Sequence, residues 1–184
     1  MLKWALLFVT GLAWGHDLGA PVALVASPEL TGPYARTVLV ATPLASGWHL
    51  GVVVNRPTGL RLSELAPDLE AAARIRQPLY IGGHQGIGKL QARVRSPRPP
   101  RAGTIHLFAD VYLVQDAAEV VRIIQKTPNA ARYVAGYVLW PPEVLAEEVA
   151  AGAWLVVAPH ADFIFREDPA SLWEDQVVEI GNTL

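Results

Sequence analysis

Short apolar runs, each closed by a proline or glycine turn, dominate the first third of this chain. Residues 22–26 (VALVA) end at Ser27-Pro28, residues 37–41 (TVLVA) precede Thr42-Pro43, and the run 49–54 (HLGVVV) stops at 55–57 (NRP). Runs of this length are typical of buried strands, and a proline cannot continue a central ladder. The pattern predicts three buried strands followed by a loop over residues 55–59.

The rest of the chain mixes strand and helix signals without a regular βαβ alternation. Further strands are predicted over residues 79–81, 89–95, 104–108, 111–114, 132–140 and 154–158. Residues 89–95 alternate, with Leu90, Ala92 and Val94 on one face, so we expect a half-exposed strand. Helical signals are a short turn and short helix over 62–76, a helix capped by Asp116, a helix from Pro142 to about Gly152, and a terminal helix after Asp168-Pro169. Clustered strands with late helices favour a single α+β domain.

Composition excludes several kinds of chemistry. The chain has no cysteine, which excludes disulfides, thiolate metal sites and a cysteine nucleophile. Its formal net charge of −2 argues against a chain-wide attraction to nucleic acid. Glycine, proline or charge interrupts every apolar segment after the first fifteen residues, so we expect no transmembrane segment in the mature chain.

The first fifteen residues have the pattern of a secretory signal peptide. Lys3 is the only charge, residues 4–14 are almost wholly apolar, and residues 13–15 (AWG) place small residues at a cleavage site. We therefore expect a signal peptide over 1–15, a domain over 16–184, and a periplasmic or secreted protein. The alternative is a cytoplasmic protein in which this segment forms a buried first strand or helix.

Two loop motifs are candidate contact sites. Asn55 and Arg56 follow a buried strand, where a guanidinium could bind a carboxylate or phosphate; the alternative is that Asn55 satisfies turn backbone groups and Arg56 makes an internal ion pair. Gly82 and Gly83 could let the backbone approach an anion, although a plain hairpin turn is the stronger interpretation. Residues 82–88 (GGHQGIG) lack the spacing of a nucleotide-binding loop.

No pattern for catalysis or metal binding is evident. The five histidines lack metal-ligand spacing, and we expect neither a metal site nor a cofactor. One exception is His16, which could chelate copper if cleavage made it the amino terminus. The carboxylates Asp110, Asp116, Asp162 and Asp168 lie beside turns, where capping explains them. A basic run could attract nucleic acid or an anionic polymer, or could be a solvated strand face; it consists of Lys89, Arg93, Arg95, Arg98 and Arg101.

The order and spacing of several short motifs resemble the YqgE/AlgH family over roughly residues 20–181. The matching pieces are 24–28 (LVASP), 36–38 (RTV), Gly51 with 54–57 (VNRP), Gly82-Gly83, Gly136-Tyr137 with Trp140, and 152–156 (GAWLV) followed by Ile164-Phe165. The resemblance implies a compact α+β domain with a mixed, partly barrel-like sheet flanked by helices. It brings no established biochemical activity, and one branch of the family is named as a regulator of alginate production.

This chain departs from the family pattern at His84, Leu139 and residues 142–144 (PEV), where the family usually has proline, glycine and glycine-glutamine-leucine. Our leading hypothesis is a non-enzymatic binding or regulatory domain whose partner is a protein or an anionic small molecule. We expect one polar surface, built from Arg36, Asn55, Arg56, Gly82, Gly83 and Trp140. The alternatives are a hydrolase or transferase acting on an anionic small molecule, or a nucleic-acid-binding regulator if the chain stays in the cytoplasm.

Overall fold

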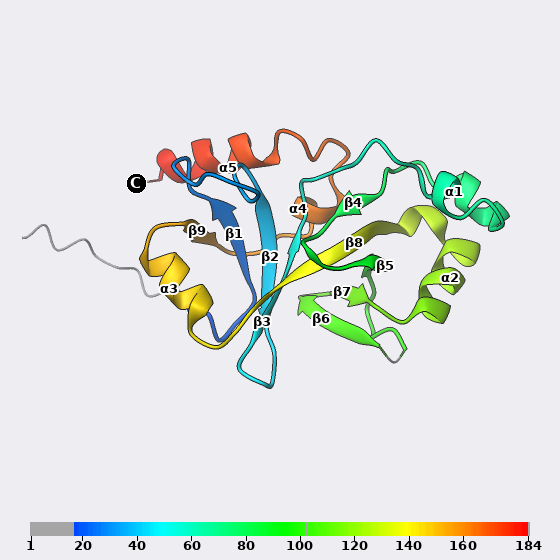
Figure 1. Ribbon diagram of the computed structural model, residues 1–184, viewed down its shortest axis with the longest axis horizontal. Helices are drawn as coiled ribbons and strands as arrows, with labels where there is room; N and C mark the ends of the chain where they lie inside the picture. The colour runs from blue at the N-terminus through cyan, green and yellow to red at the C-terminus, as the bar shows by residue number, and fades with distance from the viewer. Residues whose placement is uncertain (1–16, 102, 184) are drawn as a thin grey trace, which may run out of the picture.

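Nine strands curl into one sheet that forms a half-barrel (Figure 1). The computed structural model describes residues 17–101 and 103–183, so the predicted signal peptide and His16 lie outside the described residues. The strands are β1 (Val22–Ala26), β2 (Val38–Pro43), β3 (His49–Val53), β4 (Tyr80–Ile81), β5 (Gln85–Arg95), β6 (Thr104–Phe108), β7 (Val111–Val114), β8 (Ala131–Trp140) and β9 (Trp154–Val157). Their order is β6-β7-β5-β8-β3-β2-β1-β9, and β4 pairs in parallel with β8 while the other pairs are antiparallel. The predicted α+β domain with a mixed, partly barrel-like sheet is confirmed.

Helices cover both ends of the sheet, with α1 and α2 at one end and α3 and α5 at the other (Figure 1). They are α1 (Leu62–Leu65), α2 (Ala117–Lys126), α3 (Val144–Ala150), α4 (Asp162–Phe165) and α5 (Leu172–Gly181), with 3₁₀ turns η1 (Glu70–Arg74) and η2 (Pro128–Ala130). The short turn and short helix predicted over 62–76 correspond to α1 and η1.

Capping explains where the helices begin. The Asp116 side chain accepts a hydrogen bond from the Glu119 amide at 2.9 Å, as predicted for the start of α2. The terminal helix begins at Leu172, later than predicted, because the Asp168 carboxylate instead accepts from the Ala170 amide in a turn before the helix. Helix α3 begins at Val144 rather than Pro142, after Glu143 has turned the backbone to a φ of 72°.

Strand β8 connects two apolar cores. The larger core fills the curl of the sheet with buried side chains such as Leu24, Val52 and Leu113. The smaller core lies between the sheet and helix α2, where Ile124 packs with Val94 and Tyr133. Because β8 contributes Val134 to the first core and Tyr133 to the second, its alternating side chains bind the two halves of the domain together.

The prediction of a half-exposed strand over residues 89–95 is wrong for the second face of β5. Gln91 is 1 % exposed and Arg93 is 0 % exposed, because the curl of the sheet covers this face with the larger core. The Arg93 guanidinium lies 4.7 Å from the centre of the Tyr80 ring and donates to the Val53 carbonyl at 3.3 Å. Burial lowers the pKa of Arg93 to about 10.

Candidate functional site

Asn55 connects the end of β3 to the loop before β2. Its side-chain oxygen accepts from the Val38 amide at 2.8 Å, and its side-chain nitrogen donates to the Arg36 carbonyl at 3.0 Å. Both polar atoms of the amide are therefore used to hold the neighbouring loop. Asn55 therefore satisfies backbone groups, as the alternative expected, but these groups belong to the loop before β2 and not to its own turn.

The interpretation of Gly82-Gly83 as a plain hairpin turn is wrong, because β4 and β5 each pair with β8 and not with each other. The two glycines are required by close packing against β8. A Cβ on Gly82 would lie 2.3 Å from the Gly136 carbonyl oxygen, and one on Gly83 would lie 2.2 Å from the Tyr137 carbonyl group. The Gly82 amide donates to the Ala135 carbonyl at 2.8 Å, and its carbonyl accepts from Val53 at 2.9 Å. The backbone amide and carbonyl of Gly82 therefore both form hydrogen bonds within the sheet. The next residue after the glycine pair, His84, is exposed.

Three loops bring Tyr34, Arg56 and His84 together. The Tyr34 hydroxyl lies 2.6 Å from Nδ1 of His84, although the two residues are 50 positions apart in the chain. Arg56 is half-buried and donates to the Ala35 carbonyl at 3.5 Å, and it makes no ion pair within the described residues. Burial raises the pKa of the Tyr34 phenol, and its contact with His84 and the nearby charge of Arg56 oppose that rise. We call these three residues the Tyr34 surface.

Aromatic side chains support the Tyr34 surface from below. The Tyr34 ring meets the Trp154 ring edge to face, with centroids 6.4 Å apart, and Trp154 meets Trp140 in the same way at 6.5 Å. Both indole nitrogens donate to one carboxylate oxygen of Glu148, Trp140 at 3.0 Å and Trp154 at 2.7 Å. Trp140 is only 4 % exposed, so it is a supporting residue and not a contact residue of the surface.

The Arg36 side chain contacts helix α5. Its guanidinium lies 4.7 Å from the centre of the Trp173 ring and forms an ion pair with Glu174. The backbone of Arg36 has a φ of 57°, which turns the chain into β2. The predicted surface is therefore divided: Arg56 lies with Tyr34 and His84, whereas Arg36 fixes the neighbouring loop to the terminal helix.

An apolar groove, which no sequence pattern predicted, lies elsewhere in the domain. It has a volume of about 1420 Å³ and lies along β9, with lining residues that include Leu18, Val149, Trp154, Val157, Phe163 and Ile180. Helix α4 contributes to one wall, and its four residues are too few to show a helical period in the sequence. Only Trp154 belongs to both the groove and the support of the Tyr34 surface.

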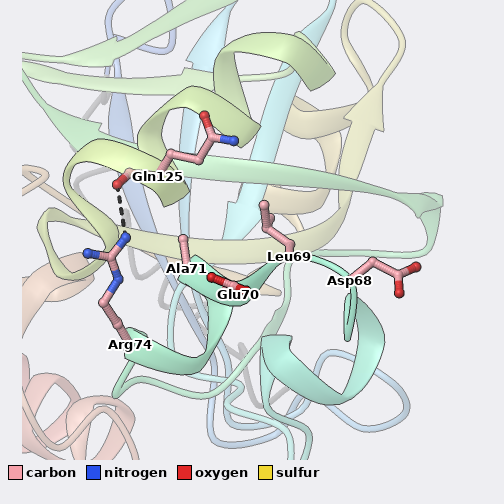
Figure 2. Close-up of a pocket in the computed structure, with 6 residues that line it drawn as sticks. All are labelled: Asp68, Leu69, Glu70, Ala71, Arg74 and Gln125. Atoms are coloured by element: carbon pink, nitrogen blue, oxygen red, sulfur yellow. Dashed lines mark hydrogen bonds between the residues drawn. The ribbon is translucent and has the colours of Figure 1, made fainter.

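A second, smaller hollow lies where η1 meets helix α2 (Figure 2). It has a volume of about 590 Å³, and Arg74 crosses it to donate to the Gln125 carbonyl at 3.2 Å. Figure 2 shows that Asp68 points away from this contact. The hollow is therefore lined by charged side chains of both signs, and these side chains do not point toward a common centre.

The basic run does not form a continuous cationic surface. Arg93 is buried, and Arg95 pairs with Asp110 at 3.0 Å. Lys89, Arg98 and Arg101 remain exposed. Two of the five positions are thus unavailable as free cations, which weakens the nucleic-acid alternative.

The histidine, aspartate and glutamate side chains of the described ranges form no group of three or more that could hold a metal ion. In residues 17–101 and 103–183, no helix combines the length and apolarity that a membrane crossing requires.

Comparisons with known proteins agree with this fold. The AlgH-like family model matches residues 23–184. A UPF0301 protein of Myxococcus xanthus is 29 % identical over 169 residues, covering 88 % of this chain and 91 % of the relative. A UPF0301 protein of Thermobifida fusca is 30 % identical over 183 residues, covering 88 % of this chain and 86 % of the relative.

Two solved structures share the architecture. The solution structure of AlgH from Pseudomonas aeruginosa has a TM-score of 0.70 at 21 % identity, and covers 89 % of each chain. A crystal structure from Corynebacterium diphtheriae has a TM-score of 0.69 at 20 % identity, covering 87 % of this chain and 85 % of the other. These likenesses concern the fold, and the sequence match carries the assignment: the chain belongs to the AlgH-like (UPF0301) family.

Proposed function

We propose that this protein is a binding domain without catalytic activity, and that it recognises an anionic group of a small molecule or protein partner at the Tyr34 surface. The observation that supports this proposal is the 2.6 Å contact between the Tyr34 hydroxyl and His84, beside Arg56 and over the Trp154 ring. A cation with flanking phenol and imidazole groups on a rigid aromatic base is suited to binding a carboxylate or phosphate.

The supporting contacts explain why such a surface would be ordered before binding. Trp140 and Trp154 are buried and share the Glu148 carboxylate, so the ring beneath Tyr34 is fixed by hydrogen bonds as well as by packing. Asn55 fixes the loop that carries Tyr34 and Arg36. Binding then requires little ordering of side chains, which lowers its entropic cost.

Titration with inorganic phosphate and with citrate, followed by backbone and histidine NMR shifts, tests the proposal. We expect saturating shifts at Tyr34, Arg56 and His84 in the wild type, and their loss in Arg56→Gln. Arg61→Gln is the matched control, because Arg61 is exposed at the far end of the same connection, where it precedes the first residue of α1. Equal, non-saturating shifts at all exposed arginines would show that the surface is not a binding site.

An enzyme that acts on an anionic small molecule is the second candidate, because Tyr34, His84 and Arg56 include groups used in acid–base catalysis. Glu148, a carboxylate whose charge acts on Tyr34, already accepts two indole hydrogen bonds that hold the aromatic base together. A positioned general base is what a hydrolase or transferase at this surface would need. The geometry therefore favours binding over catalysis.

We also propose that the domain works outside the cytoplasm, after removal of residues 1–15. The support is the apolar N-terminal sequence with its single lysine. Mass spectrometry of the amino terminus after expression in a bacterial host tests this directly. A mature chain that begins near His16 is expected, and recovery of only intact chains from the cytoplasm would contradict export.

A further inference from the structure

The apolar groove lies along β9, which is an edge strand of the sheet. Strand β9 is last in the strand order and pairs only with β1 among the described strands, with Trp154 opposite Ala26 and Val157 opposite Ala23. The other edge of β9 therefore presents backbone amide and carbonyl groups without a neighbouring strand. Such an edge is suited to an extended segment of polypeptide, which can supply the missing hydrogen bonds.

The walls of the groove favour an apolar segment. Helices α3 and α5 lie on either side of β9 (Figure 1), and they contribute Val149 and Ile180 to the lining, while α4 contributes Phe163. Trp154 is 5 % exposed at the base. A segment with large apolar side chains would bury them against these walls, whereas a charged segment would lose hydration there.

The sequence that precedes Leu18 contains an apolar segment of this character. Leu18 lines the groove, and its carbonyl oxygen is held 2.8 Å from Nε2 of His49. The apolar run of residues 4–14 (WALLFVTGLAW) contains no charge and ends four positions before Leu18. Four extended residues span about 14 Å, so the run begins within reach of the groove.

We propose that residues 4–14, as long as they remain attached, occupy the groove beside β9. The groove is then covered in the intact chain and uncovered when the segment is removed. This proposal is independent of the Tyr34 surface, because the two sites share only the buried ring of Trp154.

The absence of cysteine makes a crosslinking test clean. Full-length protein is made by cell-free synthesis without membranes, so that the N-terminal segment is retained. Thr10→Cys is combined with Ala146→Cys, which lies on the groove wall, or with Ser46→Cys. Ser46 is exposed outside the groove lining, in the loop before His49, whose side chain contacts Leu18. A short bismaleimide reagent should join the Thr10/Ala146 pair at least about fivefold faster than the Thr10/Ser46 pair, because docking raises the effective concentration.

A second crosslinking experiment introduces a charge into the groove. Ala150→Glu places a carboxylate on the exposed rim of the lining and should reduce crosslinking of the Thr10/Ala146 pair to the rate of the Thr10/Ser46 pair. Ala118→Glu, at an exposed position on α2, is the matched control and should leave the ratio unchanged. Equal rates for both cysteine pairs, or crosslinked dimers whose yield rises with protein concentration, would overturn the proposal; the dimers would identify a second copy as the occupant.

Discussion

The two faces of strand β5 are both buried, but they carry different kinds of side chain. On one face, Ala92 and Val94 pack with Tyr133 and with helix α2, as an apolar core ordinarily does. On the other face, Gln91 and Arg93 are equally buried but carry polar groups into the curl of the sheet. The comparison shows that an alternating sequence identifies the faces of a strand but not whether both will be covered.

The polar face is also less completely hydrogen-bonded. Arg93 lies directly opposite Arg132 on β8, so two guanidinium groups share one face. Buried side-chain atoms without a hydrogen-bond partner among the described residues gather here: Oε1 of Gln91, Nε and Nη2 of Arg93, and Nε of Arg132. On the helix-covered face, by contrast, the Tyr133 hydroxyl donates to the Pro128 carbonyl at 3.1 Å. One face therefore stabilises the fold by packing, and the other carries a desolvation cost.

The largest expected effect is a cavity on the helix-covered face. Ile124 on α2 is 1 % exposed, and Ile124→Ala should lower the free energy of unfolding by about 2–5 kcal/mol. Urea unfolding followed by circular dichroism measures the change. Val121→Ala on the same helix is the control, because Val121 is 40 % exposed and should change stability by no more than about 0.5 kcal/mol. Equal losses in the two variants would contradict the packing of α2 on β5.

The polar face should respond with the opposite sign. Arg93→Met replaces a buried guanidinium with an apolar chain of similar length, and we expect the free energy of unfolding to rise by about 1–4 kcal/mol because the desolvation cost disappears. The same urea titration measures it. A loss of stability would mean that the contacts with Tyr80 and Val53 outweigh the cost of burying the charge.

Arg95 gives that experiment its internal control. It lies two residues along the same strand, but it is exposed and pairs with Asp110 at the surface. Arg95→Met should change stability by at most about 1 kcal/mol, because exposed ion pairs contribute little. A large effect at Arg95 as well would show that the response at Arg93 is not a consequence of its burial.

Local patterns in the sequence predicted most strands and the cap of α2, because period, proline stops and a capping aspartate act over a few residues. The burial of Arg93 was not predictable in this way, since it follows from the curl that places Tyr80 and Val53 over it. Asn55, Arg56 and the glycine pair were selected as candidates from their turn chemistry, whereas the contacts that they make follow from the neighbouring loop and from β8. The contact between Tyr34 and His84 was not predicted, because no local sequence pattern indicates that two loops 50 positions apart meet. The edge position of β9 is likewise set by strand order, which no single segment encodes.

Alkaline pH should distinguish the two faces most finely. On the helix-covered face, burial raises the pKa of Tyr133 from 10.0 to about 12. Between these values the unfolded chain loses the phenol proton while the folded chain keeps it, so this contribution to stability is present below about pH 10 and is lost as the pH rises. On the polar face, burial lowers the pKa of Arg93 to about 10, so above this pH the folded chain loses a proton that the unfolded chain keeps, and stability rises.

Urea unfolding at pH 8.5 and pH 10.5 compares these opposite slopes. Between pH 8.5 and pH 10.5, the free energy of unfolding of Tyr133→Phe should fall by about 1 kcal/mol less than that of the wild type. The free energy of unfolding of Arg93→Met should fall by about 1 kcal/mol more than that of the wild type. Groups common to all three proteins cancel in these differences. If Arg93→Met followed the wild-type slope, the guanidinium would keep its proton in the folded chain throughout this range. The cost of the polar face would then have to be offset by its contact with the Tyr80 ring rather than relieved by deprotonation.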